Sequence, residues 1–71
     1  MKIEGVNVDQ KRVPITIVSI LKKSRGRIRV RIAETRMKLD NATINGKEYE
    51  VLTSMGRGRY IMRERNREAA A

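Results

Sequence analysis

Apolar and charged residues alternate one for one along residues 27–32, where three arginines are interleaved with three β-branched residues. Successive side chains of a β-strand point to opposite faces of the sheet. This period of two therefore predicts a strand with its β-branched side chains in a core and its guanidinium groups outside. Ser24, Arg25 and Gly26 just before it predict a turn, because glycine readily adopts a positive φ. With the β-rich segment 14–21, they predict a hairpin whose second strand is strongly cationic.

The segment 15–21 carries apolar side chains at positions of both parities. Ile15, Ile17 and Leu21 fall on one face of a regular strand, and Val18 and Ile20 fall on the other. A strand of this kind is covered on both faces. The second cover is either the carboxy-terminal segment or a second subunit, and the alternative is a strongly bent strand in a closed barrel. The sequence therefore leaves open whether the protein forms a homodimer.

The segments on either side of this hairpin are less regular. Residues 1–10 alternate weakly and predict an edge strand with a bulge at Gly5. Residues 33–39 favour neither strand nor helix and are interpreted as a connection. Asp40 and Asn41 then predict a turn.

The second half of the chain contains its clearest turn signal, Asn45-Gly46. Both residues accept φ > 0, as a two-residue type I′ hairpin turn requires, so strands are expected at 42–44 and 47–53. Residues 54–59 predict a turn rich in Gly and Arg, followed by a strand at 60–63. Because Arg-Gly-Arg occurs in this turn and in the earlier one, the two turns are expected to line one groove.

Five or six short strands with tight turns and little helix predict an all-β fold. The expected form is a small SH3-like or OB-like barrel, or a strongly twisted antiparallel sheet, with a short C-terminal helix or disordered tail. A chain of 71 residues is long enough for one small domain and too short for two. We expect a single β domain at 1–62 and a basic C-terminal helix or tail at 63–71.

Charge separates this chain from an ordinary small domain. Seventeen Lys and Arg against eight Asp and Glu give a formal net charge of +9, and no acidic residue lies between Asp9 and Glu34. A run of charge is usually just a solvated face, but solubility is served by both signs interspersed. The concentration of one sign indicates a partner that carries phosphates. The candidate binding residues are Lys22, Lys23, Arg25, Arg27, Arg29, Arg31, Arg57, Arg59 and Arg63.

The missing residue types exclude several kinds of chemistry. The chain has no Cys and no His, which removes the thiolate nucleophile, the usual metal ligands and the usual general base. No remaining pair resembles a nucleophile and its base, so we expect no enzymatic activity, no metal and no cofactor. No apolar run reaches the ~18 residues of a membrane span, and the amino terminus does not resemble a signal peptide. The expectation is a cytoplasmic protein without a membrane partner.

The mode of binding follows from the side chains that are present. Tyr49 and Tyr60 are the only aromatic residues, so base stacking is a poor prediction. Arginines on a strand and at turns instead favour duplex DNA or structured RNA as the partner. Either would be held mainly through its phosphates. The alternative is a small structural or regulatory subunit, such as a phage-type accessory or assembly factor, that engages an acidic protein partner.

Overall fold

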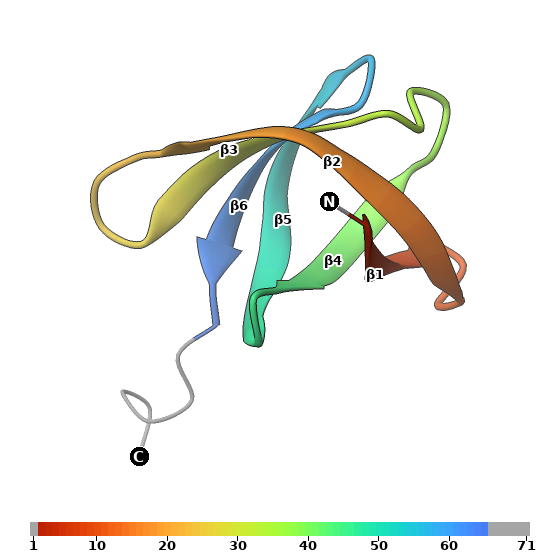
Figure 1. Cartoon of the computed structure of the whole chain (residues 1–71), viewed down its shortest axis with the longest axis horizontal. Helices are drawn as coiled ribbons and strands as arrows, with labels where there is room; N and C mark the ends of the chain where they lie inside the picture. Colours follow the sequence, from red (N-terminus) through yellow and green to blue (C-terminus); the bar gives the residue numbers. More distant parts are fainter. Residues whose placement is uncertain (1, 66–71) are drawn as a thin grey trace.

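The structure is a computed structural model, and it describes residues 2–65. Six strands account for most of these residues (Figure 1). They are β1 (Lys2–Asn7), β2 (Arg12–Lys22), β3 (Arg27–Ile32), β4 (Leu39–Ile44), β5 (Lys47–Gly56) and β6 (Arg59–Glu64).

The strands form one closed antiparallel barrel in the order β1-β2-β3-β6-β5-β4, with β4 paired back to β1. This confirms the prediction of an all-β fold of the small-barrel type. Residues 2–65 contain no helix, and hence none that would cross a membrane. The predicted C-terminal helix or tail falls mostly on residues 66–71, outside the described part of the chain, and β6 itself continues through Arg63 to Glu64.

Along β2, the residues that face the barrel interior switch from odd-numbered to even-numbered positions at Val18. Its pairing with β3 skips from Ile17↔Ile32 to Ser19↔Arg31, so Val18 forms a bulge. Before the bulge Ile17 points inward, and after it Ile20 lies opposite the buried Val30. Because a bulge bends a strand and reverses the facing of later residues, the bent strand in a closed barrel is the alternative that explains the mixed pattern.

Strand β1 is not the edge strand that the sequence predicts, because it pairs with both β2 and β4. Nor is Gly5 a bulge, since the irregularity in the β1–β4 pairing falls between Val6 and Asn7. Gly5 is buried, and a Cβ placed on it would lie 2.6 Å from Leu39 Cδ1. The glycine permits close packing between strand and core.

The turn predicted at Asp40 and Asn41 is also wrong. Both residues lie inside β4, where Asn41 pairs with Val6 on one side and Glu50 on the other. The turn predicted at Asn45-Gly46 is confirmed, with φ values of 52° and 78° at the two residues. Unlike Asn45, Asp40 and Asn41 are not followed by a glycine, and barrel closure holds them extended.

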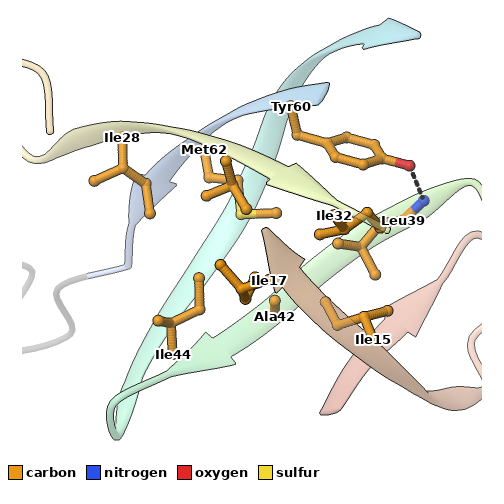
Figure 2. Close-up of a cluster of buried hydrophobic side chains, with 10 residues drawn as sticks. Ile15, Ile17, Ile28, Ile32, Leu39, Ala42, Ile44, Tyr60 and Met62 are labelled. Carbon is orange, nitrogen blue, oxygen red and sulfur yellow. Dashed lines mark hydrogen bonds between the residues drawn. The ribbon is translucent and has the colours of Figure 1, made fainter. Parts of the chain in front are cut away.

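Ten of the described residues form a buried apolar core that fills the barrel, and they come from β2, β3, β4 and β6 (Figure 2). They are Ile15, Ile17, Ile28, Val30, Ile32, Leu39, Ala42, Ile44, Tyr60 and Met62. The β-branched residues of β3 are all among them, so the inward half of the alternating pattern in 27–32 is confirmed.

Tyr60 connects this core to the segment that crosses from β3 to β4. Its side chain is 1% exposed, and its hydroxyl donates a hydrogen bond to the Met37 carbonyl. The same oxygen accepts one from the Leu39 amide at 3.3 Å, the dashed line in Figure 2. One phenol thus satisfies two backbone groups where the chain enters β4.

Replacing Tyr60 by phenylalanine should therefore lower the free energy of unfolding by about 1–3 kcal/mol, because a buried amide and a carbonyl lose their partner. Urea denaturation measures the change. Tyr49→Phe is the control, since the Tyr49 hydroxyl has no hydrogen-bond partner within residues 2–65. An equal loss in both variants would contradict the role given to the Tyr60 hydroxyl.

Candidate functional site

Five of the predicted arginines gather on the outward face of two adjacent strands, β3 and β6. The register of this pair sets Arg27 opposite Arg63, Arg29 opposite Ile61, and Arg31 opposite Arg59. Cross-strand partners share a face of the sheet, and the alternate residues of β3 are buried in the barrel. We call the set Arg27, Arg29, Arg31, Arg59 and Arg63 the arginine face.

The arginine pairs occupy the positions of closest approach between the two strands. The ladder ends in the hydrogen bonds from the Ile32 amide to the Gly58 carbonyl (2.8 Å) and from the Glu64 amide to the Gly26 carbonyl (3.1 Å). Hydrogen-bonded and non-hydrogen-bonded pairs alternate in an antiparallel ladder, so both arginine pairs are of the second kind. Their Cα atoms are therefore about 4.5 Å apart, with neighbouring side chains.

Few carboxylates neutralise these side chains. Arg63 donates to Glu50 Oε1 on β5 at 2.6 Å, in an exposed ion pair. Within residues 2–65, Arg27, Arg29 and Arg31 make no ion pair. Arg59 donates to backbone carbonyl oxygens in its own turn, at 3.4 Å. The arginine face is thus strongly positive, with Glu50 as the one carboxylate of the described residues that pairs with it.

Arg29 occupies the middle of the face and has apolar neighbours. Leu21 lies opposite it on β2 and Ile61 opposite it on β6. The side chain is half-buried, and its Nε is buried without a hydrogen-bond partner among the described residues. Packing of the stem between two apolar residues holds the charged group at the centre of the face.

The two Arg-Gly-Arg turns have the same backbone form but do not lie together. Arg25 and Gly26 have φ values of 63° and 71°, and Arg57 and Gly58 have 56° and 77°. Because β3 and β6 are antiparallel, the β2–β3 turn lies at one end of their ladder and the β5–β6 turn at the other, as Figure 1 shows. The expectation that both turns line one groove is wrong, and they instead bracket the arginine face.

Of the remaining candidates, Arg57 lies in the β5–β6 turn and the other three lie around the β2–β3 turn. Lys23, Arg25 and Arg27 surround one shallow hollow there, together with Ser24. Lys22, the last residue of β2, lies opposite the buried Ile28, so its side chain starts on the inner side of the sheet. It is exposed but does not belong to the arginine face.

Three neighbours of the face were not identified from the sequence: Leu21 and Ile61 as its apolar centre, and Glu50 as the partner of Arg63. Each depends on strand register, for which the local pattern carries no signal. The opposite side of the barrel differs in charge. A groove over β1, β4 and β5 is lined by Glu4 and Glu48 as well as by basic residues.

The chain matches no protein-family model, and no curated protein or solved structure matches it significantly. The arginine face is therefore the main guide to function.

Proposed function

We propose that this protein binds nucleic acid, as duplex DNA or structured RNA, and holds it mainly through the phosphate backbone. The observation that supports this most is the arginine face itself, which sets five guanidinium groups on two adjacent strands beside a single carboxylate of residues 2–65. A surface of this kind attracts polyanions and guides their approach.

Arginine is the side chain best suited to such a role. Its guanidinium group stays charged at any physiological pH and presents a planar fork of donors that matches two phosphate oxygens. Along β3 the three arginines follow one another every second residue, about 6.6 Å apart. This row offers repeated contacts to a chain of phosphates rather than a single pocket for a small anion.

Base stacking has little support on this surface. Tyr60 is used in the core, and Tyr49 is half-buried and packs against the core from β5. No other aromatic residue exists in the chain. Modules that hold single strands depend on exposed aromatic rings, so backbone contacts to a duplex or a folded RNA fit these residues better.

An acidic protein is the rival partner, and two exposed apolar residues on β2 favour it. Val18 and Leu21 are 56% and 55% exposed. The bulge accounts for Val18 without any partner, however, and Leu21 adjoins Arg29 on the arginine face. A pull-down from nuclease-treated lysate separates the two proposals, because partners bridged by nucleic acid are lost and a directly bound protein is retained.

A salt titration tests the proposed function. If six to eight cations contact phosphates of a DNA duplex, the logarithm of the association constant should fall against the logarithm of salt concentration with a slope of about −5 to −7. Fluorescence anisotropy with a short labelled duplex, between about 50 and 200 mM salt, measures it. A slope near zero, or no binding at the lowest salt, would contradict the proposal.

A further inference from the structure

The arginine face places like charges where a folded barrel should avoid them. Like charges directly opposite each other on adjacent strands are destabilising, and Arg27–Arg63 and Arg31–Arg59 are two such pairs at the closest cross-strand positions. We propose that each pair is a clamp in which two guanidinium groups hold one phosphate of the nucleic-acid backbone. This inference rests on the proposed function and adds which arginines of the face share a phosphate.

The geometry favours one shared phosphate per pair. Side chains that start about 4.5 Å apart on one face are close enough for their guanidinium groups to reach one anion. In the structure Arg59 and Arg63 donate to acceptors on β5 instead, so binding of the anion turns both side chains toward β3. A phosphate between them offers several acceptor oxygens and accepts charge-assisted hydrogen bonds from both forks. The anion also removes the repulsion that the empty pair carries.

The two clamps differ in their surroundings. Arg31 has no acidic partner within residues 2–65, and Arg59 has to give up only two long hydrogen bonds, to the Met55 and Gly56 carbonyl oxygens at 3.4 Å. Arg63 already contacts Glu50 at 2.6 Å, so a phosphate at Arg27–Arg63 must compete with a carboxylate. The Arg31–Arg59 clamp is therefore the stronger of the two.

The spacing of the clamps indicates what fills both. Arg27 and Arg31 are four residues apart on β3, which is about 13 Å along the strand. A single phosphate fills one clamp at most, whereas a nucleic-acid backbone supplies phosphates to both. Arg29 lies between the clamps and contributes a separate contact.

The test compares Arg31→Gln, Arg59→Gln and the double variant in the full chain, by anisotropy with one duplex DNA across the same salt range. A clamp that holds one phosphate predicts that the double variant loses about 0.9 from the salt slope, and that the two single losses in binding free energy sum to more than the double loss. Two independent contacts would instead remove about 1.8 from the slope with additive losses, which would overturn the clamp.

The matched control is the double variant Arg12→Gln and Lys47→Gln, which removes the same charge away from the face and should leave the slope nearly unchanged. Thermal unfolding of the Arg31/Arg59 double variant should show a Tm equal to or above that of the wild type, because a repulsive pair is gone. A clearly lower Tm of the double variant would overturn the clamp but not the proposed function. The same holds if the wild type shows a steep salt slope and the double variant shows the same slope. A wild type that does not bind the duplex would overturn the proposed function as well.

Discussion

Replacing Gly58 by alanine is expected to lower the free energy of unfolding by about 1.5–3.5 kcal/mol. A Cβ at this position would lie 2.4 Å from the Ile32 carbonyl oxygen, and φ is +77°. The left-handed conformation alone costs an alanine about 1–2 kcal/mol. Relief of the clash then requires the backbone to move, which weakens the 2.8 Å hydrogen bond from Ile32 to Gly58, worth about 0.5–1.5 kcal/mol. Small domains are marginally stable, so the variant should be largely unfolded at moderate urea.

Gly46→Ala is the control that separates conformation from contact. Gly46 has nearly the same φ, +78°, but nothing lies within 4 Å of a Cβ placed there. The free energy of unfolding of Gly46→Ala should therefore fall only by the conformational cost of about 1–2 kcal/mol. Urea denaturation of both variants measures the difference. Equal losses would show that the approach of Gly58 to Ile32 carries no energetic weight.

The parts of this fold that could be predicted are those that depend on neighbours in sequence. The strand at 27–32 follows from its alternation, and its observed bounds are the same. The turn at Asn45-Gly46 follows from the φ preferences of two residues. In these places the local preference and the final fold agree, so a short window carries the information.

The parts that could not be predicted depend on distant strands. The bulge at Val18 exists because β2 must bend to pair with β3 and still close the barrel. Asp40 and Asn41 are common turn residues, but pairing to β1 and β5 keeps them in a strand. Because the barrel is closed, β1 is not the edge strand that the sequence predicts. Each of these wrong predictions rests on a local preference that tertiary pairing overrides.

The candidate site divides in the same way. The row of Arg27, Arg29 and Arg31 could be predicted because one strand produces it. Its pairing with Arg59 and Arg63 could not, since a shift of one residue in the β3–β6 register would have turned those two side chains away. The register therefore turns a charged strand into a two-stranded face, and the proposed function depends on that face.

Neutralising the whole arginine face should abolish most nucleic-acid binding while the barrel stays folded. The variant replaces all five arginines by glutamine, which removes two clamps and the Arg29 contact, or three phosphates. At about 0.9 per phosphate, the salt slope should become less steep by about 2.7, which at 0.1 M salt is a loss of about 500-fold in affinity. The barrel should stay folded because all five side chains start on its outward face. The one ion pair lost, the exposed Arg63–Glu50 pair, is worth at most about 1 kcal/mol.

The control keeps the net charge equal and moves the substitutions off the face. Both variants lose five of the nine net positive charges and become +4. The control replaces Lys11, Arg12, Arg36, Lys38 and Lys47 by glutamine. If the +9 charge acted only as a diffuse field, the two variants would bind equally weakly. Because contacts at defined phosphates determine affinity in the proposed mode, the control should retain most of its binding in the same anisotropy titration. Circular dichroism of both variants should retain the β spectrum of the wild type, so that any lost binding reflects lost contacts rather than an unfolded barrel.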